Sequence, residues 1–532
     1  MELRRDSRVG RCSPWCMCPD MKMSSATKAT RKISPAEIFE DFFPTQPQTG
    51  FYFEAVNEYE PFEGWNDDIF FTILPNPDSA LDQIASYDEA ELTQLARVIA
   101  LTHRQYFVCA TRLEKNQHVQ MAHAFGVKVR VTKHSTLDGL VSRLSDPRWW
   151  RRQINRLADA RREHLAQIKR QLGRRADQQC CSDATMAIMR ARKIKTDKFL
   201  GGAYKVISQT VELESPVVFS LLEVAQAQQA NRINELYVDI KAMEKIAIGK
   251  GWGWMFITLT ASAEYHSNPA LGRDSYDPNL SPRDANKSIG RDWIAICGAL
   301  KEQGLKPCET YFGFRVTEVH EDGCPHWHVL VFHAPGVERV VEKAIGRIYS
   351  SRPSSYFDKN KANIIRIGLP KENSSAASAA SYIYGYLAFA LSGGEDSNGS
   401  GTAYKYQCAI KAMGARQYQM FGINGARGKL RALAKVKRLR DCPDNILKLA
   451  NRLHVDQGVD GRNEIQLNAR VEFLLGGASR LELIKEVGLN SLGESVEKTV
   501  GIKHQDDMRS VTISGLCEDI DADVVKKIID GK

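Results

Sequence analysis

Two histidines lie two positions apart in the stretch EVHEDGCPHWHVLVF, residues 318–332. Side chains alternate along a β-strand, so His326 and His328 share one face of the strand that the hydrophobic run around them predicts. An isolated pair of this kind is compatible with a packed core as well as with metal ligands. A third ligand on the same face would favour the metal site.

The preceding residues supply such a ligand. A second strand is predicted over residues 314–320, and the turn between the strands holds Gly323, which suits the left-handed position of a short hairpin loop. If the hairpin closes tightly, Glu318 lies opposite His326, and a register moved by two residues places it opposite His328. Only an odd shift would move the carboxylate to the other face. We therefore predict a metal site of Glu318, His326 and His328.

The spacing argues against several kinds of metal site. A zinc hydrolase with the pattern HxHxDH needs an aspartate where Leu330 stands, and a cupin needs a glutamate where Val331 or Phe332 stands. A non-haem iron triad normally has its carboxylate at another spacing. The remaining interpretation is a divalent-metal site with open positions for a phosphate oxygen.

A group of tyrosines follows in AASYIYGYLAFALSG. In a helix, Tyr382 and Tyr386 are four residues apart and share a face, whereas Tyr384 points roughly the opposite way. Packing is the ordinary explanation for such a run. The functional alternative is that a tyrosine attacks a phosphate polarised by a metal and becomes a covalent phosphoryl carrier.

Positive charge is unevenly distributed, although the net charge is a modest +9. Residues 148–175 predict a strongly basic helix with its apolar residues at helical spacing and its arginines on the other faces. A second basic run covers residues 427–440. Two such runs favour a phosphate-rich partner, and we expect Arg151, Arg152 and Arg156 to contact DNA.

The organisation of the chain predicts an α+β protein without a membrane span or signal peptide. The scattered cysteines are typical of a cytosolic protein with reduced thiols. The expected regions are a disordered tail (1–32), a mixed α/β region of unknown role (33–145), a basic helical region (146–250), an α+β domain (251–440) and a C-terminal helical region (441–532).

Several stretches in order resemble one known family. FITLT at 256–260, FRVTEVHEDGCPHWHVLVF at 314–332, YIYGY at 382–386 and ARQYQMFGINGARGKLRAL at 415–433 are similar to the phage replication gene A proteins. These are HUH endonucleases, named for their His-hydrophobic-His motif. The segments RLSDPRWWRRQINRLADARREH and DKFLGGAYKV also resemble that family. The likeness extends over roughly residues 90 to 440.

The resemblance implies a rolling-circle replication initiator with an HUH domain, whose central antiparallel sheet is flanked by helices. One of Tyr382 and Tyr386 would attack origin DNA, single-stranded or supercoiled, hold its 5′-phosphate and free a 3′-OH for a host polymerase. A host helicase is a further expected partner, and the host cytoplasm is the expected location. The metal would be Mg²⁺ or Mn²⁺, and histidine ligands suit Mn²⁺ better than an all-oxygen site would.

The chain departs from the family pattern in its tyrosine run. Family members usually carry a lysine three residues after a tyrosine, where this chain has Gly385 and Phe389. Arg416 and the lysines of residues 405–411 are candidates to replace that lysine at the phosphate. Two alternatives stay open: a non-catalytic DNA-binding protein on a decayed HUH domain, and a relaxase or transposase of the same chemistry.

Overall fold

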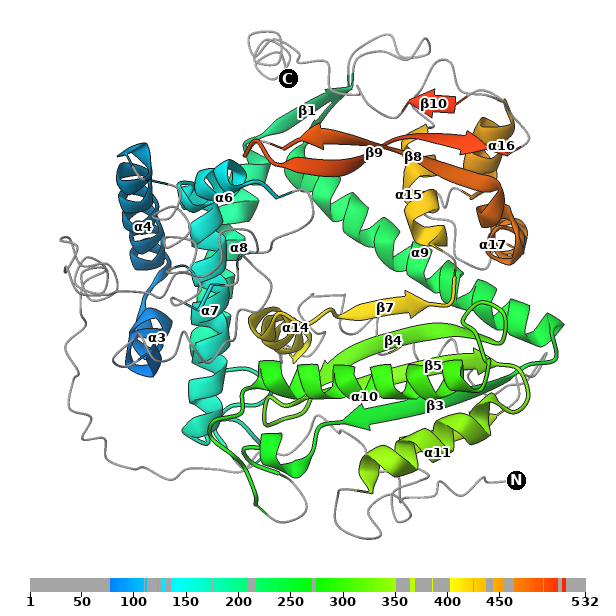
Figure 1. Cartoon of the computed structure of the whole chain (residues 1–532), viewed down its shortest axis with the longest axis horizontal. Helices are drawn as coiled ribbons and strands as arrows, with labels where there is room; N and C mark the ends of the chain where they lie inside the picture. The colour runs from blue at the N-terminus through cyan, green and yellow to red at the C-terminus, as the bar shows by residue number, and fades with distance from the viewer. Residues whose placement is uncertain are drawn as a thin grey trace.

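The structure is a computed structural model of the 532-residue chain. It describes residues 77–109, 111, 122, 126–127, 129, 135–174, 176–207, 217–269, 274–350, 364–368, 385, 402–423, 425–436, 444–453, 464–490, 492–505 and 510–512. Figure 1 shows a central sheet surrounded by helices, with a smaller sheet at the C-terminal end. The predicted α+β class is confirmed.

The central sheet has five antiparallel strands in the order β6-β3-β5-β4-β7. Its strands are β3 (Gly253–Thr260), β4 (Tyr311–Val319), β5 (Pro325–His333), β6 (Ile365–Gly368) and β7 (Tyr418–Phe421). The hairpin of β4 and β5 lies at its centre. His326 and His328 therefore belong to β5, a strand with neighbours on both sides. A central strand has little freedom to shift its register, because every residue is hydrogen-bonded in place.

The two faces of this sheet are buried by different helices. Odd-numbered residues such as Val329 and Val331 pack against α10 (Pro282–Glu302) and α11 (Val337–Tyr349). Even-numbered residues such as Phe314 and Leu330 pack against α9 (Leu221–Gly249). The alternation of side chains along each strand separates these two apolar cores. The short 3-10 helix η1 (Ala263–Tyr265) follows β3.

The N-terminal helices form a core of their own around α7 (Pro147–Ile168). The partners of α7 there are α3 (Pro77–Ser86), α4 (Glu89–Cys109) and α6 (Leu137–Leu144). Sequence analysis predicted α7 as a basic helix with its arginines on the outer faces, which is only partly right. Arg162 is buried and forms an ion pair with Asp159 at 2.9 Å. Helix α7 is therefore a packed central helix, with charge on only part of its surface.

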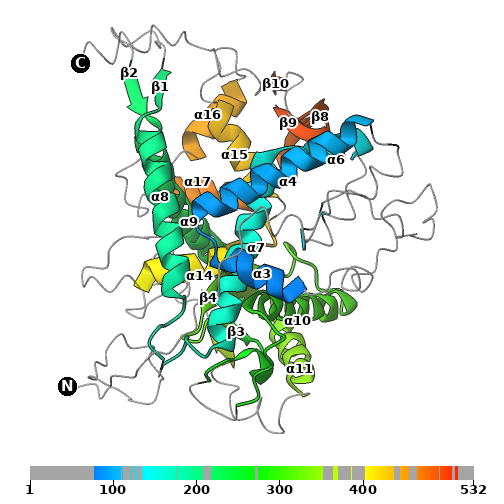
Figure 2. The ribbon, with the colours of Figure 1, turned by 90° about the vertical axis from the view of Figure 1, so that its left-hand side faces the viewer.

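Two long helices follow and lie side by side in Figure 2. Helix α8 (Asp183–Gly201) contacts α9, and strands β1 (Tyr204–Ile207) and β2 (Val217–Ser220) pair antiparallel between them. Ser220 begins α9 with a capping box, since its hydroxyl accepts from the Glu223 amide while the Glu223 carboxylate accepts from the Ser220 amide. The region at 146–250, which was predicted as helical, thus also contains a pair of strands among its described residues.

The C-terminal region corrects one prediction. Helices α14 (Thr402–Met413) and α15 (Ala426–Val436) precede it, within residues 251–440. The region predicted as helical from residue 441 begins as expected with α16 (Asp444–Leu453), α17 (Glu464–Leu475) and the short η2 (Gly477–Arg480). A three-stranded antiparallel sheet then follows, formed by β8 (Leu481–Leu489), β9 (Ser495–His504) and β10 (Ser510–Thr512). The prediction of a largely helical region was wrong for these residues. Their apolar positions recur every second residue only in part, because much of β8 and β9 is exposed on both faces.

None of the described helices is both long and apolar enough to cross a membrane.

Candidate metal centre

The β4–β5 hairpin closes through a short turn, with three residues between His320 and Cys324. The His320 amide donates to the Cys324 carbonyl, and the Gly323 amide donates to the His320 carbonyl. Gly323 has φ +84°, a conformation that residues with a Cβ rarely adopt. In the resulting register Glu318 lies directly opposite His326, as the sequence predicted.

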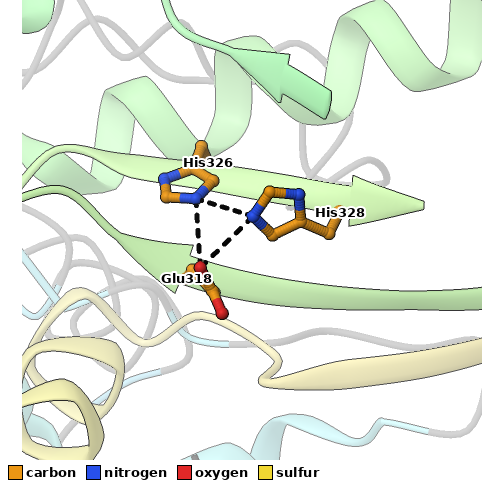
Figure 3. A group of neighbouring side chains, drawn as sticks. All are labelled: Glu318, His326 and His328. Atoms are coloured by element: carbon orange, nitrogen blue, oxygen red, sulfur yellow. Dashed lines mark hydrogen bonds and ion pairs between the residues drawn. The ribbon is translucent and has the colours of Figure 1, made fainter. Parts of the chain in front are cut away.

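Three side chains of this hairpin converge on one point, as Figure 3 shows. The Glu318 Oε2 atom lies 3.2 Å from Nε2 of His326 and 3.2 Å from Nε2 of His328. The two Nε2 atoms are 2.9 Å apart. Both histidines are buried, and Glu318 is partly buried. The predicted trio is thus brought together with one ligand atom from each residue.

This geometry fits a divalent cation. Two ligands at about 2.1 Å from an ion and at right angles to one another are about 3.0 Å apart, which is the spacing expected in an octahedral site. The three measured separations of 2.9, 3.2 and 3.2 Å match that spacing. The donor set of two imidazoles and one carboxylate suits Mn²⁺ and related metals, with the remaining positions open for water or a phosphate oxygen.

The neighbouring strand holds the imidazoles in place. Thr258 of β3 is paired with His328, and its Oγ1 atom lies 3.2 Å from His328 Nδ1. This contact leaves Nε2 directed at the other two ligands. Such outer partners of metal-binding histidines fix ring orientation. The two threonines of FITLT were not singled out from the sequence, although their alternation on a strand beside the histidines was a usable signal.

A second layer of polar residues lies behind the trio. The Nε2 atom of His320 lies 3.2 Å from Oγ1 of Thr260, and its ring is 4.2 Å from that of His326. His266 then contacts His320 edge-on and lies 3.0 Å from the Asp322 carboxylate. His320 therefore does not belong to the trio and packs behind it.

The electrostatics of the trio favour ligands in their metal-binding protonation states. Burial alone would raise the pKa of Glu318, but hydrogen bonds and charge interactions with His326 and His328 lower it to about 2. Burial lowers the pKa of His328 and, more strongly, that of His320, because an imidazolium is costly to desolvate. Glu318 is therefore anionic and the His328 ring neutral near neutral pH, which leaves lone pairs available.

The other predicted site residues have different outcomes. Tyr382 and Tyr386 lie outside the described residues; of their run, Gly385 is described, as an exposed residue in helical conformation. The three arginines assigned to DNA binding, Arg151, Arg152 and Arg156, are exposed on α7. Arg416 is exposed where the chain enters β7, and its carbonyl accepts a hydrogen bond from the Thr317 hydroxyl at 2.9 Å. Their contact with DNA remains a prediction.

The family of the chain follows from comparison with known proteins. The model of the bacteriophage replication gene A protein (GPA) family matches residues 79–391, which is more than half of the chain and includes all three ligands of the trio. The chain belongs to the bacteriophage replication gene A protein family. The stretch at 415–433, which also resembles the family, lies beyond the matched residues.

Individual relatives resemble the chain over part of their length. The replication gene A protein of Escherichia phage 186 is 31% identical over 301 residues, which are 53% of this chain and 41% of the relative. The probable replication protein P12 of Pseudoalteromonas phage PM2 is 26% identical over 69% of this chain and 57% of its own. A probable replication endonuclease from a prophage-like region of Shigella boydii is 23% identical over 57% of this chain and 38% of its own.

These matches span from 38% to 57% of the relatives' own lengths. No solved structure matches the chain.

Proposed function

We propose that this chain is a metal-dependent replication endonuclease that nicks one strand of phage origin DNA by tyrosine attack. The observation that carries the proposal is the convergence of Glu318, His326 and His328, with ligand atoms 2.9 to 3.2 Å apart on a rigid central hairpin. Membership of the replication gene A family supports it, as do the relatives named as probable replication endonucleases.

The chemistry assigned to each residue follows from its type. Glu318, His326 and His328 would hold Mg²⁺ or Mn²⁺, which supplies a Lewis acid to the scissile phosphate. Tyr382 or Tyr386 attacks the phosphorus, so the tyrosine oxygen forms a bond to the 5′-phosphate while the bond to the 3′ oxygen breaks and leaves a 3′-OH. The covalent link preserves the phosphodiester energy, so the second tyrosine can take part in rejoining the strands.

The biological setting of the proposal is rolling-circle DNA replication in the host cytoplasm. The 3′-OH is the primer for a host polymerase, and a host helicase would unwind the duplex ahead of it. Single-stranded or supercoiled origin DNA is the substrate. The exposed Arg151, Arg152 and Arg156 of α7 would add phosphate contacts that carry affinity without reading sequence.

A covalent adduct tests this proposal directly. The chain is incubated with single-stranded origin DNA and Mn²⁺, and the products are separated on a denaturing gel. We expect a protein–DNA adduct that depends on the metal and is abolished in the double variant Tyr382→Phe, Tyr386→Phe, whereas Tyr384→Phe retains it. An adduct that persists in the double variant would show that the nucleophile is another residue.

The same experiment distinguishes the proposed endonuclease from the main alternative. A non-catalytic DNA-binding protein on a decayed nuclease domain would bind the DNA with the expected salt sensitivity but form no adduct at any metal concentration. A relaxase or transposase would form the adduct, and would differ in the DNA sequence that it cleaves.

A further inference from the structure

Tyr418 lies on the same face of the central sheet as the metal trio. It is paired with Val316 of β4, and Val316 is paired with His328 of β5. Residues directly opposite one another in a sheet share a face, and two strand spacings of about 4.8 Å separate Tyr418 from His328 by roughly 10 Å. The tyrosine ring is buried and stacks on Phe314. It therefore marks the boundary between the apolar part of this face and the trio.

Helix α9 crosses this boundary. Its core residues Leu236, Ile240 and Met243 recur at helical spacing and cover the apolar part of the sheet face. One turn before Leu236 the same side of the helix presents Arg232, whose guanidinium donates to the Tyr418 hydroxyl. The stripe of α9 thus changes from apolar to cationic where the sheet face changes from apolar to metal-binding.

A second arginine reaches the same tyrosine from another helix. Arg427 of α15 has its guanidinium carbon 5.6 Å from the centre of the Tyr418 ring, and that of Arg232 is 5.1 Å from it. Both arginines retain access to solvent. Arg427 is also the first residue of the second basic run noted in the sequence, for which the metal centre gives no role.

Negative charge around this pair is insufficient to neutralise it. Asp239 of α9 is buried and forms its close ion pair with the equally buried Arg470, while Arg427 lies 3.9 Å from its other oxygen. Among the described residues, Arg232 has no carboxylate partner. Arg427 and Arg470 therefore share one carboxylate, while Arg232 donates to the neutral Tyr418 hydroxyl. A surplus of cation beside a partly desolvated surface is the arrangement that binds a phosphate.

We propose that Arg232 and Arg427 form a binding site for a backbone phosphate of the DNA strand that lies across the metal centre, at a phosphate neighbouring the scissile one. This inference rests on the proposed nuclease function and deepens it by giving the strand a path from the trio toward α9 and α15. Arg232 and Arg427 are positioning residues, since they hold DNA and touch no reacting atom.

Salt dependence of binding provides the test. Binding of a short fluorescent oligothymidine is measured by anisotropy in EDTA, so that no cleavage contributes, over a series of salt concentrations. Each lost phosphate contact lowers the slope of log K against log salt by about 0.7 for single strands. Because the two arginines share one phosphate, we expect that decrease for the double variant Arg232→Gln, Arg427→Gln, a smaller decrease for each single variant, and recovery of the slope in the two Arg→Lys variants.

Arg339→Gln is the matched control. It removes one exposed arginine from α11, which packs on the opposite face of the sheet. Its slope should equal that of the unchanged chain. The proposal is overturned if Arg232→Gln and Arg427→Gln keep the unchanged slope while their melting temperatures fall, because the arginines would then only hold Tyr418 and α15 in place. An equal decrease in Arg339→Gln would also overturn it.

A second measurement uses the unchanged chain, so it tests the site even if the variants fail to fold. Arginines are modified with phenylglyoxal in the presence and absence of oligothymidine, and the modified peptides are identified by mass spectrometry. The oligonucleotide should protect Arg232 and Arg427 but not Arg339, and equal modification with and without it would refute the site. Failure of the nuclease proposal is separate, since it appears as absence of the covalent adduct whatever the protection pattern.

Discussion

Two buried polar clusters of this protein differ in the chemistry of their members. In the metal trio, a carboxylate and two imidazoles direct lone pairs at one another. In the second cluster, which joins α4, α7 and α8, carboxylates alternate with guanidinium groups. Asp159 accepts from Arg162 at 2.9 Å and from Arg192 at 2.6 Å, and Arg192 also donates to Glu89 at 2.6 Å.

The difference separates a network of paired opposite charges from a cluster whose ligand atoms could hold a cation. In the α4–α7–α8 network each carboxylate meets a donor and each arginine meets a carboxylate, so its charges are paired, although the Nη2 atoms of Arg162 and Arg192 have no hydrogen-bond partner among the described residues. In the trio the partners of the Glu318 carboxylate are the two imidazoles, and no lysine or arginine among the described residues pairs with it. His326 Nδ1 is buried and, within the described part of the chain, accepts and donates no hydrogen bond. Charge balance within a buried cluster is thus a guide to whether it awaits a ligand.

Removal of a trio member should have the largest effect. His326→Ala is expected to reduce adduct formation by more than about 100-fold, because loss of even an outer partner of a metal ligand commonly costs 10- to 100-fold. Binding of single-stranded DNA in EDTA should be retained and should stay sensitive to salt. Loss of both adduct and binding would assign the histidines a structural role and would remove the contrast between the clusters.

Removal of a member of the α4–α7–α8 network should instead affect folding. Asp159→Ala leaves Arg162 buried and one contact of Arg192 unmade, and we expect a loss of about 3–5 kcal/mol in the free energy of unfolding. Urea denaturation measures this loss. Where the variant is folded, Mn²⁺ should raise its melting temperature as much as it raises that of the unchanged chain. A loss below about 1 kcal/mol would indicate a surface-like ion pair.

A milder change beside the trio should lower the affinity for the metal without abolishing metal binding. Thr258→Val removes the hydroxyl next to His328 Nδ1 while preserving the shape of the side chain. The expected decrease in Mn²⁺ affinity is about 10- to 100-fold, measured by calorimetry. Thr260→Val, whose hydroxyl contacts His320 instead of a ligand, is the matched control and should have a smaller effect. Equal losses in the two variants would argue against orientation of His328 by Thr258.

The pH dependence of metal binding should show the smallest effect. Burial holds the pKa of His328 below its ordinary 6.5, and Glu318 has a pKa of about 2. Metal needs the neutral imidazole, so protons compete only as the pH falls below 6.5, while Glu318 stays ionised. The rise in melting temperature caused by Mn²⁺ should therefore persist at pH 6.5 and decline below it. A rise already lost at pH 6.5 would mean that His328 titrates like an exposed histidine.

The sequence alone was sufficient for the metal trio because the determining geometry is local. Strand alternation places Glu318, His326 and His328 on one face, and Gly323 permits the tight turn that sets their register. The basic helix predicted over residues 148–175 was also recognisable from its periodicity, although the helix ends at Ile168. Which of its arginines are buried was not predictable from the sequence, since the neighbours that bury Arg162 and leave Arg151 exposed come from distant parts of the chain.

Tertiary structure decided the remaining features. The strands at 481–512 were missed because exposure on both faces weakens the alternating pattern that identifies a strand. The arginine pair at Tyr418 joins α9, α15 and β7, which are far apart in the sequence. The extended backbone of a strand by itself makes side chains alternate between the two faces with a period of two residues. The meeting of three separate elements depends on how their apolar faces pack, and no local pattern records it.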